Sequence, residues 1–172
     1  MRKILLTLTI FLVALTISAC NESVEHENLD IKEIVNEYSV GHFENITASI
    51  TSDELIVTDE KNDETTTYKL PKDEFFVSIA PFINTTHPCV NHSLTSCQGE
   101  LVEEDFKVYI EDEDGNVLVD ETKTSLENGF IDLWLPREKT FKVKIEYEGM
   151  TSEQEISTFK GDNTCITTMR LM

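Results

Sequence analysis

The cysteines of this 172-residue chain constrain its fold more than any other feature. Cys89 and Cys97 lie close together with His87 and His92 beside them, whereas Cys165 lies 68 residues beyond Cys97. If the three cysteines act together, the C-terminal segment must fold back against the loop that carries the first two. An exported protein stabilised only by disulfides needs an even number of cysteines. Three thiols leave one unpaired, which favours a metal site, because thiolate and imidazole ligands select a soft ion such as Cu(I).

The count of three depends on the N-terminus, which has the pattern of an export signal. A positively charged start precedes a nearly unbroken apolar run over residues 4–17. Such a run is too short for a membrane span of about 20 residues and is typical of a signal peptide. Residues 17–20, Ile-Ser-Ala-Cys, resemble a bacterial lipobox, whose cysteine is acylated and becomes the new N-terminus. We predict a signal peptide over residues 1–19 and a diacylated Cys20 that anchors the chain to the outer face of the cell membrane. The alternative is cleavage at the same place without a lipid.

The charge of the processed chain excludes one class of partner. Removing residues 1–19 leaves 153 residues with 12 basic and 33 acidic side chains, a net charge of −21. Nucleic-acid binding needs a basic face that neutralises phosphates, and this composition does not supply one. The acidic residues are spread along the whole chain, as expected for a solvated surface. The length suffices for one domain or two small ones.

Hydrophobic periodicity predicts an α+β fold that is mainly β. After a flexible polar tether over residues 20–28, apolar residues at helical spacing predict a short helix over residues 29–38. The period then changes to two, and short β-like runs complete an N-terminal α+β unit over residues 29–84. Regularly spaced strands predict an antiparallel β-sandwich, with a cysteine-containing tail, over residues 101–172. The Cys/His loop at residues 85–100 is expected to lie at the junction of the two units.

No catalytic residue is predicted. The sequence has no Gly-rich phosphate loop, no serine in a nucleophile-elbow context and no Cys-x-x-Cys pair. The acidic run at residues 112–116 has the acids of a calcium loop, but it lacks the glycine and the glutamate that such a loop requires. Its Asp-Gly-Asn sequence predicts a hairpin turn instead.

Three interpretations of the cysteines remain open on the residues alone. In the structural one, Cys89 and Cys97 form a disulfide and Cys165 is buried as a small apolar residue. Zinc is a second, because it accepts mixed Cys and His ligands, although structural zinc sites usually use Cys-x-x-Cys pairs. We favour the third, in which the three sulfur atoms bind Cu(I) and His92 is the first additional ligand. His87 is a further flanking ligand, although the proline after it directs it away unless the chain bends there.

The favoured interpretation carries a geometric expectation. Without metal, the three sulfur atoms should lie roughly 3.5–4.5 Å apart, close enough to surround Cu(I) at about 2.2–2.3 Å by analogy with zinc–sulfur bonds. A sulfur of Cys165 more than about 10 Å from both others would leave a Cys89–Cys97 disulfide as the better account.

The same residues resemble a known family. The His-Pro-Cys-x-x-His stretch at 87–92, the Cys-Gln-Gly-Glu-Leu stretch at 97–101 and the Thr-Cys-x-Thr-Thr stretch at 164–168 resemble the CueP family of extracytoplasmic copper-binding proteins. The resemblance covers roughly residues 29–172. It implies a copper-resistance protein that holds copper through its cysteines, here the three named above with their two flanking histidines. It also implies a two-domain, dimeric architecture, although nothing in the sequence shows a dimer.

The resemblance leaves two functional classes. One is a lipoprotein that holds Cu(I) for copper tolerance or for transfer to a copper-acceptor protein. The other is a thiol redox protein that reduces Cu(II) or exchanges disulfides. The family has also been associated with Cu(II) reduction and with copper supply to a superoxide dismutase. The predicted anchor on Cys20 departs from the family pattern and indicates a Gram-positive cell surface, which puts delivery to a periplasmic enzyme in doubt.

Overall fold

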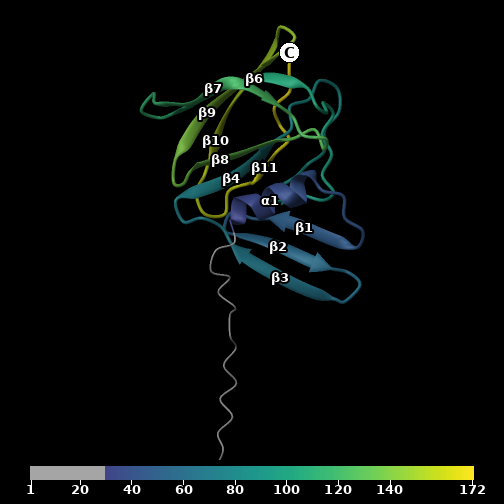
Figure 1. Ribbon diagram of the computed structural model, residues 1–172. Helices are drawn as coiled ribbons and strands as arrows, with labels where there is room; N and C mark the ends of the chain where they lie inside the picture. The colour runs from purple at the N-terminus through teal and green to yellow at the C-terminus, as the bar shows by residue number, and fades with distance from the viewer. Residues whose placement is uncertain (1–29) are drawn as a thin grey trace, which may run out of the picture.

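The computed structural model describes residues 30–172. The predicted signal peptide, Cys20 and the rest of the predicted tether lie outside this range. The described chain folds into a β-sandwich with a smaller, helix-covered sheet beside it (Figure 1). Its elements, in chain order, are α1 (Ile31–Val40), β1 (Ile46–Ile50), β2 (Glu54–Asp59), β3 (Glu64–Lys69), β4 (Glu74–Ile79), β5 (His92–Ser93), β6 (Asp105–Asp112), β7 (Val117–Thr124), β8 (Ile131–Pro136), β9 (Thr140–Tyr147), β10 (Met150–Ser157) and β11 (Cys165–Ile166).

The single helix of the described chain overlaps the predicted range of 29–38, but it covers Ile31–Val40 and so begins and ends two residues later. The Asp30 side chain caps its start by accepting a hydrogen bond from the backbone N–H of Lys32 at 3.0 Å. The helix ends at Gly41, whose N–H donates to the carbonyl of Glu37. Its apolar face packs on the sheet β3-β2-β1-β5. The buried residues of this smaller core are Val35, Ala48, Ile50, Leu55, Val57, Leu70, Phe76 and Leu94.

Two sheets form the sandwich, so the predicted mainly-β α+β class is confirmed. The sheet β10-β9-β6-β7 is entirely antiparallel and packs against the sheet β11-β4-β8. Phe75, Phe106 and Phe141 are fully buried between them, and each such side chain contributes about 1.5–3 kcal/mol by leaving water. The hairpin between β6 and β7 turns at Gly115, which has a φ of +80°, so the acidic run forms a turn, as predicted.

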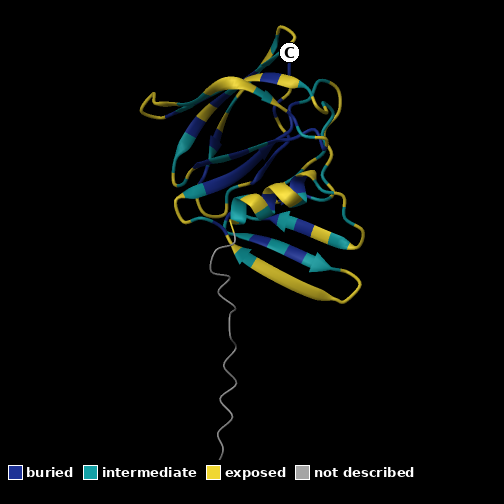
Figure 2. Ribbon diagram, viewed as in Figure 1, coloured by how far each residue is buried: buried dark blue, intermediate teal, exposed yellow. Residues whose placement is uncertain are grey.

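The sheet β11-β4-β8 is shared by both cores. In β4, Phe75, Val77 and Ile79 point into the sandwich, whereas Phe76 points toward the smaller core. Trp134 of β8 also lies on the side of the smaller core, and its ring centroid is 5.2 Å from that of Phe76. Figure 2 accordingly shows β4 as a buried strand through the middle of the molecule. This strand lies in the range expected for the N-terminal unit, yet it pairs with β8. The division into two units therefore remains a prediction.

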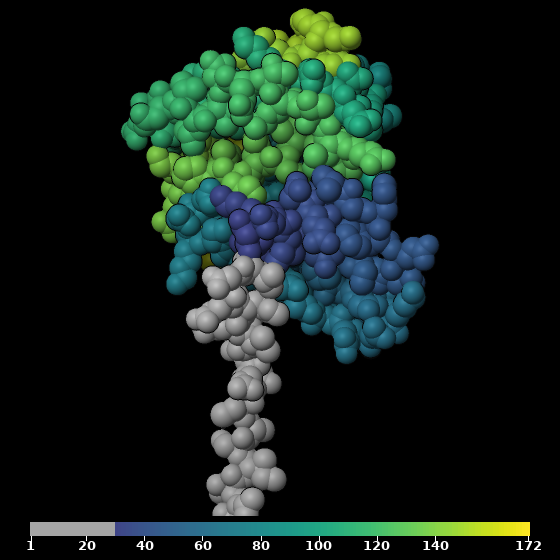
Figure 3. Space-filling view, viewed as in Figure 1, coloured from purple at the N-terminus to yellow at the C-terminus, as the bar shows by residue number. Residues whose placement is uncertain are grey.

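A partly buried carboxylate fastens the helix to the shared sheet. Asp132 of β8 accepts hydrogen bonds from the hydroxyl groups of Ser39 at 2.7 Å and Ser78 at 2.5 Å. Burial raises the pKa of Asp132, and the two hydroxyl groups oppose that rise. The helix consequently lies directly against the sandwich, and the space-filling view shows the two parts as one continuous body (Figure 3).

The C-terminal segment runs back along β4. β11 pairs with β4 in parallel, with Cys165 opposite Ser78. The N–H of Ala80 donates to the carbonyl of Ile166 at 2.9 Å, and farther along Phe82 forms a bridge with Arg170. This return places the last cysteine beside the Cys/His loop. Within residues 30–172, no helix has the length and apolar character needed to span a membrane.

Candidate metal site

Four of the five predicted ligands converge where the two cores meet. The ligand atoms of Cys89, His92, Cys97 and Cys165 all lie within 4.8 Å of one another. The sulfur atoms of Cys89 and Cys97 are 3.7 Å apart, and Nδ1 of His92 lies 3.5 Å from the sulfur of Cys165. We call these four residues the Cys/His cluster. They come from the loop, from β5 and from β11, so the fold-back of the C-terminal segment is what assembles them.

Cys89 and Cys165 form a disulfide in this structure, and Cys97 is a free thiol. The alternative disulfide between Cys89 and Cys97 is therefore not the one that forms. The expected separation of 3.5–4.5 Å holds for Cys89 and Cys97 at 3.7 Å but not for the bonded pair. The reason lies in the backbone: the carbonyl of Val90 accepts a hydrogen bond from the N–H of Cys165 at 3.1 Å. This contact sets the two Cα atoms 5.6 Å apart, a separation that suits a disulfide.

His92 is fully buried within the cluster. Its ring centroid lies 4.4 Å from that of Phe130 and 6.3 Å from that of Phe76. Burial, followed by the charge of His87, lowers the pKa of His92 to about 4. The imidazole is therefore neutral at neutral pH, which is the form that binds metal ions. Its Nε2 is buried and has no hydrogen-bond partner in the described chain, an unusual state for a buried polar atom.

The free thiol lies at the more accessible side of the cluster. Cys89 and Cys97 are half-buried, whereas Cys165 is buried. Burial raises the pKa of the Cys97 thiol, and a hydrogen bond from the backbone of Ser93 opposes that rise. Ala80 and Phe130 form the apolar wall against which the cysteines pack. A metal ion would thus approach from the side of the loop, and its binding would displace the thiol proton.

His87 is the predicted ligand that the structure does not bring into the cluster. It is half-buried, and its ring centroid lies 6.4 Å from that of Phe130. The residue before it is fixed, because the hydroxyl of Thr86 donates to the carbonyl of Thr167 at 2.8 Å. His87 therefore flanks the cluster, and its charge contributes to the lowered pKa of His92.

Glu100 closes the base of the Cys/His loop, a role that no sequence pattern indicated. Its carboxylate accepts hydrogen bonds from the backbone N–H groups of Ile83 at 2.7 Å and Asn84 at 2.9 Å. On the other side of the loop base, the N–H of Gly99 donates to the carbonyl of Asn128 at 2.7 Å. Gly99 also lies against the backbone of Gly129. These contacts hold both ends of the loop, although the only sequence signal was that Gly99 and Glu100 belong to the Cys-Gln-Gly-Glu-Leu stretch that begins at Cys97.

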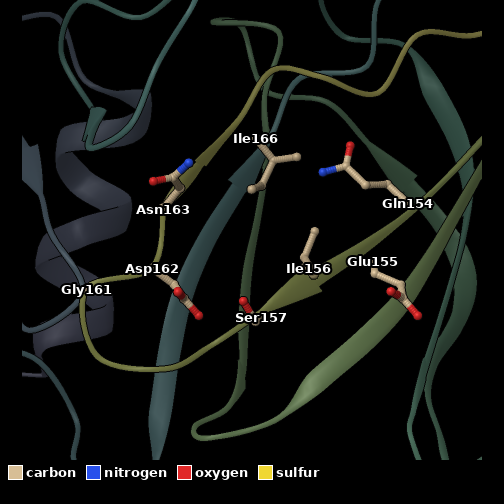
Figure 4. Close-up of a pocket in the computed structure, with 8 residues that line it drawn as sticks. All are labelled: Gln154, Glu155, Ile156, Ser157, Gly161, Asp162, Asn163 and Ile166. Carbon is tan, nitrogen blue, oxygen red and sulfur yellow. The ribbon is translucent and has the colours of Figure 1, made fainter.

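A separate polar cavity of about 240 Å³ lies between β10 and the segment that leads into β11 (Figure 4). Glu155 and Asp162 are among its lining residues, and Asp162 accepts a hydrogen bond from the N–H of Phe159 at 2.8 Å. The described residues that line it include no cysteine or histidine. The cavity is therefore distinct from the Cys/His cluster and offers no soft ligand.

Comparison with known proteins identifies the family. The family described as "Periplasmic copper-binding protein CueP" matches residues 29–170. The crystal structure of S.CueP is similar, with a TM-score of 0.78 and 36% sequence identity, covering 83% of this chain and 88% of that chain. Comparison with curated proteins finds no match. The match over most of the chain and the shared fold lead to one conclusion: this chain belongs to the CueP family of periplasmic copper-binding proteins.

Proposed function

We propose that this protein binds Cu(I) outside the cytoplasm through Cys89, Cys97 and Cys165, with His92 as a fourth ligand. The convergence of three sulfur atoms and one neutral imidazole within 4.8 Å carries this proposal. Sulfur and imidazole donors fit a soft ion, and no carboxylate belongs to the cluster. Membership of a copper-binding family favours copper over zinc, which the same ligands also suit.

Binding through all three sulfurs requires the reduced protein. Two electrons and two protons from a dithiol reductant convert the Cys89–Cys165 disulfide into two thiols. Each thiol then loses its proton as it ligates the metal. The apolar wall of Ala80 and Phe130 keeps water from one side of the cluster, which strengthens the electrostatic part of thiolate–metal bonding.

Reduction of Cu(II) is the second candidate, and the position of the disulfide favours it. Two thiols at Cys89 and Cys165 can reduce two Cu(II) ions to Cu(I), forming one disulfide and releasing two protons. The fold already places these cysteines where that bond forms. Cys97 lies 3.7 Å from the sulfur of Cys89, where it remains available as a ligand for one product ion.

Anaerobic metal titration of the reduced protein tests both candidates. Serine at any of the three cysteines should weaken Cu(I) binding by orders of magnitude, and His92→Ala should weaken it less. His42→Ala is the matched control, because the His42 side chain is 85% exposed and lies outside the cluster. Counting thiols after chelation separates the candidates, since binding leaves three and Cu(II) reduction consumes two. Tight binding of zinc with none of Cu(I) would contradict the copper assignment.

We also propose that Cys20 carries the lipid and holds the copper site at the outer face of the cell membrane. The lipobox-like stretch at residues 17–20 supports this attachment. It would make an acceptor protein at the same surface the natural recipient of the ion. Membrane fractionation tests the anchor: Cys20→Ala should release the protein, and a wild type that is wholly soluble with an unmodified N-terminus would contradict it.

A further inference from the structure

Thr164 precedes Cys165 and is fully buried. Its backbone N–H donates to the carbonyl of Val90 at 3.1 Å, and its carbonyl accepts from the N–H of Ser78 at 2.8 Å. Its hydroxyl accepts a hydrogen bond from the N–H of His92 at 3.0 Å and donates one to the carbonyl of Ile50 at 2.7 Å. One residue therefore contacts β1, β4, β5 and the Cys/His loop.

The hydroxyl of Thr164 bridges the paired strands β1 and β5. Ile50 and His92 are opposite each other in that antiparallel pair. The Thr164 hydroxyl stands between the N–H of His92 and the carbonyl of Ile50, accepting from the first and donating to the second. A hydroxyl suits this position because its single oxygen can donate one hydrogen bond and accept another. Because β5 has only two residues, this bridge supplies much of what fixes the backbone of His92.

The geometry points to Thr164 as the residue that positions His92 against Cys165. This inference rests on the proposed metal binding of the cluster. His92 and Cys165 lie on different elements, β5 and β11, and Thr164 is the covalent neighbour of one and the hydrogen-bond partner of the other. The His92 ring has no hydrogen-bond partner at Nε2 within the described residues, so its orientation depends on its backbone, on its aromatic neighbours and on the 3.5 Å contact between its Nδ1 and the sulfur of Cys165. Thr164 is a positioning residue and does not itself ligate the ion.

Thr164→Val tests this role, because valine keeps the shape of the side chain and removes the hydroxyl. Competition of the reduced protein with a chromophoric Cu(I) chelator should show Cu(I) binding about 10- to 100-fold weaker, the usual cost of losing a partner that orients a metal ligand. Thr164→Ser retains the hydroxyl and should bind Cu(I) about as tightly as the wild type. Should Thr164→Val fail to fold, Thr164→Ala takes its place with the same expectations.

Thr158→Val is the matched control for stability. Thr158 is also buried, and its hydroxyl likewise accepts from one backbone N–H, that of Lys139, and donates to the carbonyl of Pro136. It lies just after β10, against the turn between β8 and β9, and belongs to no part of the cluster. The Thr158→Val variant should lose about as much stability as Thr164→Val, whereas its Cu(I) affinity should equal that of the wild type.

A double-mutant cycle shows whether Thr164 acts through His92. In a His92→Ala protein, Thr164→Val should cause no further loss of Cu(I) affinity. An equal loss in both backgrounds, a serine variant as weak as the valine variant, or a valine variant as tight as wild type would overturn the inference. Absence of Cu(I) binding by the wild type itself would instead refute the proposed function, so the two failures are distinguishable.

Discussion

The contact between Gly129 and Gly99 gives a stability prediction that a matched glycine isolates. A Cβ atom on Gly129 would lie 2.9 Å from three backbone atoms of Gly99. Rotation of a side chain cannot relieve this contact, because the facing atoms are all main chain. Gly129 also has a φ of +78°, and Gly149 has a nearly equal φ of +83° with no atom within 4 Å of the position that a Cβ would take. Gly149→Ala therefore reports the conformational cost without the contact.

The two substitutions should differ by the cost of the contact. Alanine in the left-handed region costs about 1–2 kcal/mol at either position. Overpacking against backbone adds about 1–3 kcal/mol at Gly129 alone. We expect Gly129→Ala to lose about 2–5 kcal/mol of unfolding free energy and Gly149→Ala about 1–2 kcal/mol. Urea denaturation at neutral pH measures both, with an unchanged dependence on urea showing that the unfolded states are comparable.

The same pair of variants connects the packing to the site. Gly99 lies two residues after Cys97, so an alanine at Gly129 should shift the end of the loop and weaken Cu(I) binding. Gly149→Ala should leave Cu(I) binding unchanged. Equal losses of stability at the two glycines would refute the close approach of the two backbones.

Two further predictions concern the surroundings of the cluster. Phe130→Ala removes a fully buried ring beside His92 and should lower the free energy of unfolding by about 3–5 kcal/mol in urea denaturation. A loss below about 1 kcal/mol would show that the ring is not packed as described. Burial opposes ionisation of Glu100, but the hydrogen bonds from Asn84 and Ile83 outweigh it and lower the pKa of Glu100 below its ordinary 4.5. The ionised Glu100 carboxylate therefore stabilises the fold fully above pH 4.5, and this stabilisation is lost as the pH falls through the lowered pKa. Glu100→Gln should be less stable than wild type at neutral pH, with the difference shrinking in acid. A difference that is independent of pH would contradict the role of the charge.

Local patterns predicted the elements whose signals lie within a few residues. Apolar residues at Ile31, Ile34 and Val35 have helical spacing, and the helix forms there. The turn around Gly115 likewise requires only its own φ of +80° and the flanking alternation. The convergence of Cys165 with the loop was predicted from ligand chemistry, because a three-thiol site requires it.

Patterns within a few residues could not predict the contacts between segments that are distant in the sequence. The β4 sequence has the pattern of a strand, but its pairing with β8 depends on which sheet can bury both Phe75 and Phe76. The Cys89–Cys165 disulfide follows from the parallel docking of β11 on β4, which covers only two residue pairs. Thr164 looked like one of several threonines in a polar run, and only the assembled sheets give its hydroxyl a donor and an acceptor.

X-ray absorption at the copper edge of the reduced, Cu(I)-loaded protein shows whether all three sulfur atoms and His92 bind the ion. We expect three sulfur neighbours at about 2.2–2.3 Å, by analogy with zinc–sulfur bonds, and one nitrogen neighbour. The nitrogen contribution should disappear in His92→Ala, and one sulfur should be lost in each of Cys89→Ser, Cys97→Ser and Cys165→Ser. A copper environment of oxygen and nitrogen alone, or a sulfur count that Cys165→Ser leaves unchanged, would contradict the site described here.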